Sequence, residues 1–398
     1  MNLYTRIMAR EELKDQVKKI KVRVIGIGGG GVNIVSEIAQ TLKGVSFLAL
    51  DTDFKSLKST PKIVEKLPFG KELTKGFGSG GDFQLAIKAA FKEKEKIKKI
   101  FENQDLVIFI SCLGGGTGSG GSLVLSRLAK NLDCLTYGVF TLPFGFEGEK
   151  KMETAKDFLL KIRKYLNAVS VIPNEKISQV LGQKISFKKS LSEINKILAK
   201  NLQSLTEIIY KPGLINIDFA DLKTVFEGRG KVCYLNSLEF EGENWQEEIE
   251  KLIHAPFFPY SVEGAKAVIL KMAGIKTLSQ MNQISKKITE KISSEAKIIL
   301  GISSAEIPKV TILATGCKEE IFPKKSVSKT KPEGAKKVKI QKPKNKPAVI
   351  RKNGLEVKKE AKEAEKEILE KEKIWEKPTF LRIKFSKGQN FLGYGSSR

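Results

Sequence analysis

The residues of this sequence best suited to chemistry are a cluster of glycines and a pair of carboxylates. Six glycines stand between Gly114 and Gly121, interrupted only by Thr117 and Ser119. They follow the apolar run 106–113 and precede a helix expected from Gly121. Glycine loses more conformational freedom on folding than any other residue, whereas bare backbone N–H groups beside a helix N-terminus form a cradle for an anion. The cluster therefore predicts a phosphate site.

A second glycine-rich stretch, GIGGGGVN, occupies residues 26–33. Its Gly26, Gly28 and Gly31 fit the pattern GxGxxG, and Asp51 lies twenty residues beyond Gly31. This spacing is typical of a dinucleotide-binding enzyme, in which the acidic residue contacts a ribose. An NAD-binding Rossmann enzyme is therefore one alternative that the sequence leaves open.

Two glycine loops on one sheet instead favour a nucleoside triphosphate that is held from both sides. The sequence has no GxxxxGK[ST] motif, so the site is not a P-loop and no lysine lies in the cradle. The phosphates must then be neutralised by backbone dipoles and by a bound Mg²⁺ ion.

The paired carboxylates are Asp218 and Asp221, in the segment NIDFAD. Residues three apart share one face where a helix begins. Two carboxylates in that position can orient and polarise a water for attack on a phosphate, which is the positioning that phosphoryl transfer requires. On the residues alone, an N-cap role for Asp218 is the simpler interpretation. His254, the single histidine, has no partner at metal or triad spacing and is expected to be structural.

These residues must be positioned by a sheet that is covered by helices. Over about the first 215 residues, short apolar runs alternate with amphipathic segments, the pattern of a parallel α/β sheet. Strands are expected at 21–28, 45–51, 106–113, 135–142 and 168–173. A long helix is expected over 187–210, because its apolar residues recur at three- and four-residue steps. A smaller α+β region follows Pro212 and ends in strand-like runs at 296–303 and 309–316.

Composition indicates an ordinary globular protein with an unusual charge. Of 398 residues, 41% are hydrophobic, and no apolar run approaches the roughly 18 residues of a membrane span. The N-terminus lacks the apolar core of a signal peptide, and the four cysteines form no CxxC pair. A cytoplasmic protein without disulfides or a metal site of its own is therefore expected.

The net charge of +26 is concentrated in part between residues 324 and 352, which hold twelve Lys or Arg and one acidic residue. This segment has few large apolar groups, so we expect a disordered linker. Its charge predicts at most a weak contact with anionic membranes. No feature of the sequence calls for a specific nucleic acid partner.

Seven segments, in order, resemble the signatures of the tubulin/FtsZ family. GGGTGSG is similar to the family's GGGTG[ST]G, and IGIGGGGVN to its first nucleotide loop. The other five are DTD at 51–53, GFGSGGD at 76–82, TLPFGFEG at 141–148, IPNEK at 172–176 and PGLINIDFADLKTV at 212–225. The resemblance implies an α/β fold: a GTPase domain with a Rossmann-like parallel sheet, a central helix, a second α+β domain and a disordered tail.

The implied organisation and function follow the family. The expected parts are an N-terminal extension (1–20), a GTP-binding domain (21–186), a central helix (187–211), a GTPase-activating α+β domain (212–318), a charged linker (319–373) and a C-terminal peptide with tail (374–398). The implied cofactors are GTP and GDP, with Mg²⁺ held mainly through the phosphates. The implied activity is GTP hydrolysis within a head-to-tail homopolymer that forms the division ring at mid-cell.

The resemblance also assigns individual residues. At the phosphates it places Gly29, Gly30, Gly31, Val32, Asn33, Gly116, Thr117 and Gly118. It implies that Glu147 holds the ribose, that Lys151 stands where the family usually has arginine, and that Asn195 reads the guanine edge. Asn216, Asp218 and Asp221 are expected to complete the site of the neighbouring subunit, so that hydrolysis waits for assembly.

Three departures from the family pattern leave a further alternative open. Val32 replaces an asparagine, Lys151 an arginine, and Leu191 an aromatic residue that often stacks on the base. Lysine lacks the planar fork with which arginine binds phosphate or carboxylate. A hydrolysis-poor filament protein, or one with a task other than division, is therefore the alternative within the same family.

The C-terminal segment IWEKPTFLRIKF, residues 374–385, gathers large apolar residues in an otherwise polar tail. A disordered chain gains nothing by exposing such residues unless they dock on a partner. The segment is similar to the peptide with which division proteins of the family bind membrane-tethering adaptors. Such an adaptor is therefore an expected partner.

Overall fold

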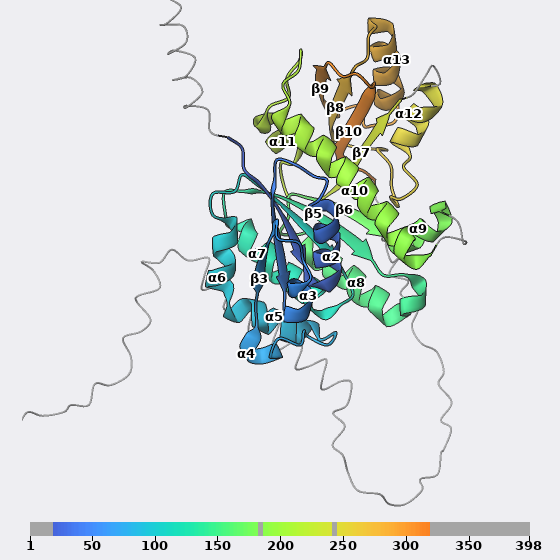
Figure 1. Cartoon of the computed structure of the whole chain (residues 1–398). Helices are drawn as coiled ribbons and strands as arrows, with labels where there is room; N and C mark the ends of the chain where they lie inside the picture. The colour runs from blue at the N-terminus through green and yellow to red at the C-terminus, as the bar shows by residue number, and fades with distance from the viewer. Residues whose placement is uncertain (1–18, 182–185, 241–244, 319–398) are drawn as a thin grey trace, which may run out of the picture. The chain divides into compact units, whose positions relative to one another are not determined.

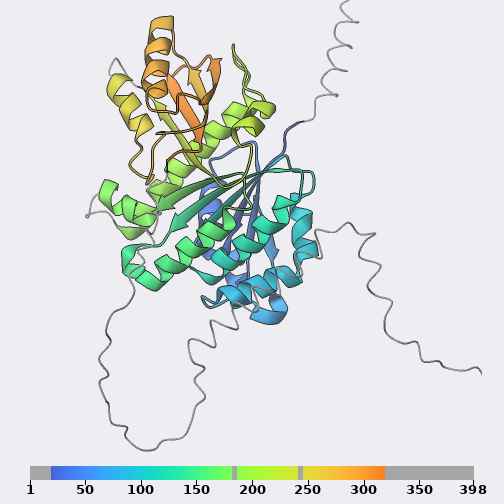
Figure 2. The same ribbon diagram turned by 180° about the vertical axis from the view of Figure 1, so that it is seen from behind.

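The computed structural model describes residues 19–181, 186–240 and 245–318 (Figures 1 and 2). The predictions for the N-terminal extension, the charged linker and the C-terminal peptide concern residues that lie almost entirely outside these ranges. In the described part, no helix is long and apolar enough to cross a bilayer.

The first half of the described chain forms a parallel sheet in the order β3-β2-β1-β4-β5-β6. Its strands are β1 (Val22–Ile27), β2 (Ser46–Asp51), β3 (Val64–Pro68), β4 (Leu106–Cys112), β5 (Leu135–Leu142) and β6 (Ala168–Pro173). All of them except β3 are buried at every position or at every position but one, as expected for a parallel sheet with helices on both faces.

The helices of this half connect successive strands. They are α2 (Gly28–Ile38), α3 (Phe54–Lys58), α4 (Lys71–Thr74), α5 (Phe83–Lys92), α6 (Lys94–Lys98), α7 (Gly116–Lys130), α8 (Glu149–Ile162) and α9 (Asn174–Leu181). The chain leaves β1 toward β2 but leaves β4 in the other direction, toward β5. Right-handed crossovers then place α2 and α7 on opposite faces, with their N-termini meeting where the strand order reverses. Open α/β sheets bind their ligands at such a point.

The second half is built around a smaller sheet. It comprises α10 (Phe187–Tyr210), α11 (Phe219–Val225), β7 (Lys231–Glu239), α12 (Trp245–Ile253), β8 (Ala267–Ala273), α13 (Leu278–Thr289), β9 (Lys297–Ser303) and β10 (Lys309–Thr315). β10 runs antiparallel to β7 and β8, and β9 lies parallel to β8 at the edge. A short parallel pairing of β6 with β7 joins both sheets into one of ten strands. In Figure 1, α10 crosses the molecule with α9 at one end and α11 at the other.

The predicted fold class is confirmed, including the helix over 187–210 and the five strands expected in the first half. The structure corrects one expectation about the glycines. Helix α7 begins at Gly116, not at Gly121, and α2 begins at Gly28, so both glycine stretches form the first turns of helices. The prediction also missed β3, an edge strand whose Glu65 and Lys66 are exposed.

Candidate functional site

An open cleft of about 390 Å³ lies at the carboxyl ends of the parallel strands. Its walls are the first turns of α2 and α7, the glycine loop 76–82, and the segment from Thr141 to Lys151. Seven of the residues predicted at a nucleotide line it: Gly29, Gly30, Gly116, Thr117, Gly118, Glu147 and Lys151. The strand reversal therefore brings together both glycine stretches, as the sequence predicts.

Helices α2 and α7, which start at this cleft, have no side-chain cap. Ile27 and Gly115 are their N-cap residues and make no side-chain hydrogen bond to the helix, and neither helix has an acidic residue in its first turn. By contrast, Asp82 caps α5 and Thr277 caps α13 through their side chains. The first N–H groups of α2 and α7 are thus left for another acceptor, and the positive ends of both helix dipoles lie at the cleft. This arrangement suits phosphate groups.

Several of the cleft glycines allow two backbones to approach each other. A Cβ added at Gly28, where φ is +71°, would lie 2.6 Å from the backbone nitrogen of Gly118. A Cβ at Gly118 would lie 2.5 Å from the carbonyl oxygen of Cys112, and one at Gly116 would lie 2.2 Å from Oγ of Ser79. Real side chains do not tolerate such distances, so these glycines are required for packing α2 against α7 and α7 against its neighbours.

Other glycines at the cleft face open space instead. An added Cβ at Gly115, Gly80 or Gly81 would meet no atom within 4 Å. Their freedom from contact leaves bare backbone along the wall of the cleft. The protein's own packing explains the first kind of glycine but not Gly115, whose φ of −86° any residue could adopt. A ligand that approaches the backbone closely would require glycine at this position.

Three buried hydroxyl groups connect the walls of the cleft. Oγ1 of Thr117 lies 2.6 Å from Oγ1 of Thr52 and 3.1 Å from Oγ of Ser79. Thr52 follows β2, Ser79 belongs to the glycine loop 76–82, and Thr117 stands in the first turn of α7. This chain of hydroxyls holds the glycine loop beside the helix N-terminus, and its rotatable hydrogens can turn toward an added acceptor.

Asp51 places a carboxylate on the same wall, at the end of β2. Its Oδ1 accepts hydrogen bonds from the backbone N–H groups of Thr52 and Asp53, at 2.7 and 3.2 Å, and its Oδ2 from Ser56 Oγ at 2.7 Å. Burial raises the pKa of Asp51, and these hydrogen bonds oppose the shift. The carboxylate is therefore held toward its own turn. Burial disfavours its ionised form, so a negative charge on Asp51 at this cleft has an energetic cost.

Glu147 and Lys151 form an ion pair at the other end of the cleft. Oε1 of Glu147 also accepts a hydrogen bond of 2.8 Å from the backbone N–H of Phe144. Burial raises the pKa of Glu147, but the bonds from Lys151 and Phe144 outweigh it and hold the pKa below its ordinary value. A fixed, ionised carboxylate at this position can accept hydrogen bonds from the hydroxyls of a sugar.

Thr141 is a cleft residue that the sequence reasoning did not select. It is 5% exposed, lines the cleft, and its Oγ1 has no nitrogen or oxygen partner in the described structure. Its cross-strand neighbour is Cys112; burial raises the pKa of that thiol, and an interaction with the Thr141 hydroxyl opposes the shift. Sulfur is only a weak hydrogen-bond partner, so a ligand or water is expected to supply a stronger one. Thr141 opens the motif TLPFGFEG, which was the only sequence signal for it.

Four residues predicted at the nucleotide do not line the cleft. Gly31 and Val32 are buried within α2, and Asn33 is exposed. Asn195 donates a hydrogen bond of 2.7 Å from Nδ2 to Oε2 of Glu37, on α2. Contact between these residues and a nucleotide therefore stays a prediction. Asn174, the first residue of α9, lines the cleft although it was not among the predicted residues.

The predicted carboxylates lie in a segment that we call the carboxylate loop, residues 212–221. Asp218 caps α11: its Oδ1 accepts from the backbone N–H of Asp221 at 2.7 Å, and Oδ2 of Asp221 accepts from the N–H of Asp218 at 3.0 Å. The N-cap interpretation is thus confirmed. Nearby, Oδ1 of Asn216 accepts from the N–H of Gly213 at 2.6 Å.

The carboxylate loop is separated from the cleft by the length of α10. None of Asn216, Asp218 and Asp221 lines the cleft, and Asn216 and Asp218 are exposed. Helix α10 has 24 residues, which corresponds to about 36 Å at 1.5 Å per residue. Its N-terminal end packs against α9, which begins at the cleft, and its C-terminal end leads into the loop. Within one chain, these carboxylates do not reach the cleft.

The sequence of this chain is similar to proteins of one known family. Residues 21–182 match the model of the tubulin/FtsZ family GTPase domain. A cell division protein FtsZ from Aquifex aeolicus is 33% identical over 319 residues, which cover 78% of this chain and 86% of the relative. Another, from Wigglesworthia glossinidia brevipalpis, is 34% identical over 305 residues, 74% of this chain and 79% of the relative.

Solved structures show the same fold. An empty FtsZ dimer from M. jannaschii superimposes with a TM-score of 0.68 at 28% identity, covering 79% of this chain and 93% of that one. A GTPγS-bound protofilament of CetZ2 from Haloferax volcanii gives a TM-score of 0.63 at 19% identity, covering 75% and 94%. The second likeness concerns the fold alone.

Proposed function

The chain belongs to the tubulin/FtsZ family and is a GTPase, and from that premise we propose that it assembles head to tail into filaments that act in cell division. Each subunit binds GTP in its own cleft, and the carboxylate loop of the next subunit completes the site for hydrolysis. The observation that carries this proposal is the separation of cleft and carboxylate loop within one chain. The NAD-binding alternative is wrong, because the chain belongs to a family of GTPases.

In the proposal, the cleft binds the nucleotide largely through its backbone. The uncapped starts of α2 and α7, with Gly29, Gly30 and Gly116, receive the phosphates, and Thr117 adds a hydroxyl. Ionised Glu147 accepts from the ribose hydroxyls, with Lys151 beside it. Mg²⁺, when bound with the nucleotide, neutralises charge on its phosphates. The remaining predicted contacts, from Gly31, Val32, Asn33, Gly118 and Asn195, extend this site to the rest of the nucleotide.

The carboxylate loop acts on the nucleotide of the next subunit. Asp218 and Asp221 orient a water toward the terminal phosphate, while Asn216 contacts the nucleotide. The capping box supports this role, because each carboxylate uses one oxygen on the backbone of α11 and keeps the other available. The box also fixes both side chains before the second subunit arrives, which favours positioning.

Exposed apolar side chains support direct contact between subunits at these two places. Phe77, on the rim of the cleft, is 85% exposed, and Leu214, in the carboxylate loop, is 86% exposed. A large apolar side chain this exposed gains from burial in an interface. A contact that joins one surface to a different one repeats without closing, and it therefore builds a filament.

The role in division follows the names of the relatives, which are cell division proteins. We propose that the filaments act in the cytoplasm at mid-cell. The segment 374–385 would bind a membrane-tethering adaptor, and the basic linker would add a weak contact with anionic membranes. Both segments lie outside the described residues.

Phosphate release from GTP, measured per subunit over a range of protein concentrations, tests the proposal. Hydrolysis completed between subunits predicts almost no turnover below a threshold concentration and a steep rise above it, coincident with light scattering by filaments. Removal of Mg²⁺ with a chelator should lower the rate. A rate per subunit that is the same at all concentrations would show that one chain hydrolyses GTP by itself, and the proposal would be wrong.

A further inference from the structure

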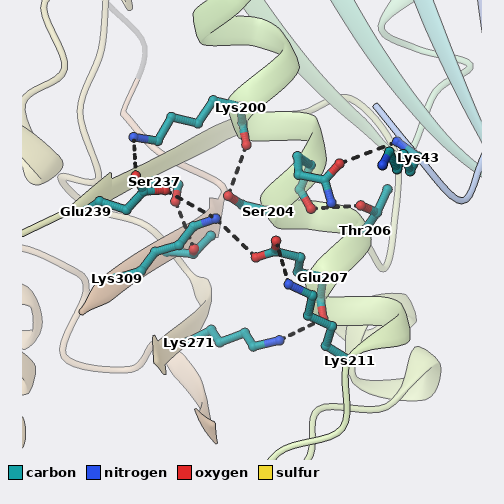
Figure 3. Close-up of polar contacts among 12 residues, drawn as sticks. Lys43, Lys200, Ser204, Thr206, Glu207, Lys211, Ser237, Glu239, Lys271 and Lys309 are labelled. Carbon is teal, nitrogen blue, oxygen red and sulfur yellow. Dashed lines mark hydrogen bonds and ion pairs between the residues drawn. The ribbon is translucent and has the colours of Figure 1, made fainter. Parts of the chain in front are cut away.

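The C-terminal end of α10 is fastened to the second sheet by charged side chains (Figure 3). Oε1 of Glu207, on α10, accepts from Nζ of Lys211 at 3.0 Å, and its Oε2 accepts from Nζ of Lys309, on β10, at 3.1 Å. Nζ of Lys271, on β8, donates to the backbone carbonyl of Glu207 at 2.7 Å. We call Glu207, Lys271 and Lys309 the ion clamp.

The ion clamp is shielded from water more than ordinary surface pairs. The side chains of Glu207 and Lys309 are 19% and 14% exposed, and Lys271 is 8% exposed. Burial lowers the pKa of Lys271, and nearby Glu207 opposes that shift. The ammonium group of Lys271 also binds a carbonyl in the last turn of α10, where a cation complements the helix dipole. Ion pairs with little exposure interact more strongly than solvated ones, so this clamp holds the helix end firmly.

The carboxylate loop begins directly after the clamp and is fastened again at its middle. Ile215 and Ile302, on β9, exchange two backbone hydrogen bonds of 3.1 and 3.0 Å. A Cβ added at Gly213 would lie 2.2 Å from the carbonyl oxygen of Ile302, so the close approach requires glycine there. The second sheet therefore holds the loop at two points, through the clamp on β8 and β10 and through the bridge to β9.

We propose that the ion clamp positions the carboxylate loop for hydrolysis. By fixing the end of α10 on the second sheet, Glu207, Lys271 and Lys309 set where Asn216 and Asp218 stand against the nucleotide of the next subunit. This inference rests on the proposed function, in which that loop completes the site. The three clamp residues are positioning residues, because they contact one another and the end of α10, from which the loop starts, and not the nucleotide. A displacement of about 1 Å at a reacting group can lower a rate roughly a hundredfold.

The test compares turnover in filaments with nucleotide binding by the monomer. Glu207→Gln and Lys309→Met should each lower kcat by about tenfold, a part of the loss that misplacement can cause. The affinity for GTP and the mass of filaments should stay as in the wild type, because the cleft lies at the other end of α10. Lys309→Arg keeps the charge and should retain most of kcat. Glu248→Gln, which removes an exposed pair with Lys251, is the matched control and should change nothing.

The outcomes separate this inference from the proposed function. If Glu207→Gln and Lys309→Met lower GTP affinity, filament mass and melting temperature together with kcat, and Lys309→Arg does the same, the clamp serves general stability and the inference is wrong. If Asp218→Asn abolishes turnover while both clamp variants keep wild-type kcat, the inference alone fails. If Asp218→Asn turns over normally, the proposed function fails first.

Discussion

The cleft and the carboxylate loop use helix N-termini in opposite ways. At α2 and α7 no side chain caps the helix, so backbone N–H groups are left for a ligand. At α11 the side chains of Asp218 and Asp221 satisfy those groups, and carboxylate oxygens remain on the outside. The first arrangement attracts an anion. The second directs negative charge outward, which suits a role other than binding an anion. This contrast is what the proposed function requires: a cleft that binds the nucleotide and a loop that acts on the nucleotide of another subunit.

The two regions also differ in what makes them rigid. The cleft depends on backbone packing, in which glycines let α2 and α7 approach each other. The carboxylate loop has a backbone bridge between Ile215 and Ile302, and it depends in addition on side chains, namely its capping box and the ion clamp at the end of α10. Substitutions at the cleft should therefore change the affinity for GTP, whereas substitutions at the loop should change kcat.

The largest expected effect is that of Asp218→Asn. Asparagine is an equally good N-cap, so α11 should keep its start, but the substitution removes the negative charge that, in the proposed function, orients the water. We expect kcat for GTP to fall at least about a hundredfold, as when a charged or dipolar group at a reacting centre is lost. Filaments should form and persist, and GTP affinity should not change.

Asp157→Asn, which removes an exposed carboxylate on α8, is a suitable control for Asp218→Asn. It should leave phosphate release, filament formation and nucleotide affinity at wild-type values. If Asp218→Asn instead weakens GTP binding by the monomer, the loop contributes to its own chain's cleft and the separation of the two regions is wrong.

The next effect distinguishes the two kinds of cleft glycine. Gly118→Ala places a Cβ against the carbonyl of Cys112 and should lower both the melting temperature and GTP affinity. Gly115→Ala meets no protein atom, so it should leave the melting temperature of the ligand-free protein unchanged. It should nevertheless weaken GTP binding by roughly tenfold, because the methyl group occupies space that the ligand needs and misaligns the phosphate contacts. Equal GTP affinity in Gly115→Ala and wild type would show that this wall does not face the nucleotide.

The sequence was sufficient to predict the buried strands and the meeting of the two glycine stretches at one site, because both depend on local patterns. Strands β4 and β5 are continuous apolar runs that are buried at nearly every position. Edge strand β3 was missed, because one side of it faces solvent and its exposed Glu65 and Lys66 give no apolar run. Helix starts were misplaced because glycine has a poor helix propensity, which tertiary packing overrides here.

Side-chain partners from distant parts of the chain could not be predicted in this way. Asn195 was expected at the base, yet its amide donates to Glu37, more than 150 positions earlier in the sequence. The buried hydroxyl of Thr141 and the ion clamp on Glu207 likewise depend on strands and helices brought together only by folding. The family motifs located the cleft, but they did not supply these contacts.

A smaller effect is expected from Thr141→Val, which removes the hydroxyl and keeps the shape of the side chain. Because Oγ1 has no nitrogen or oxygen partner in the described structure and only a weak one in the Cys112 thiol, the ligand-free protein should lose little stability. GTP should bind about threefold to tenfold more weakly, the value of one ordinary hydrogen bond. Isothermal titration would measure this, with Thr141→Ser as the variant that retains the hydroxyl. Unchanged affinity in Thr141→Val would mean that water, not nucleotide, is the missing partner.

The smallest expected effect concerns the ion pair of Glu147 with Lys151 and its dependence on pH. The pKa of Glu147 in the folded protein lies below its ordinary value of 4.5, because the bonds from Lys151 and Phe144 outweigh the effect of burial. The unfolded chain therefore takes up the proton first as the pH falls. The pair stabilises the fold fully above about pH 4.5, and this contribution is lost progressively as the pH falls from there through the lower pKa of the folded protein. Lys151 is 41% exposed, so the contribution should not exceed about 1 kcal/mol. Urea unfolding of wild type and Glu147→Gln without nucleotide should show a difference in stability at pH 7 that shrinks toward pH 4. If the difference in stability between wild type and Glu147→Gln grows on acidification, the folded protein stabilises the protonated carboxyl. Glu147 would then not be the ionised acceptor that the proposed contact with the ribose hydroxyls requires.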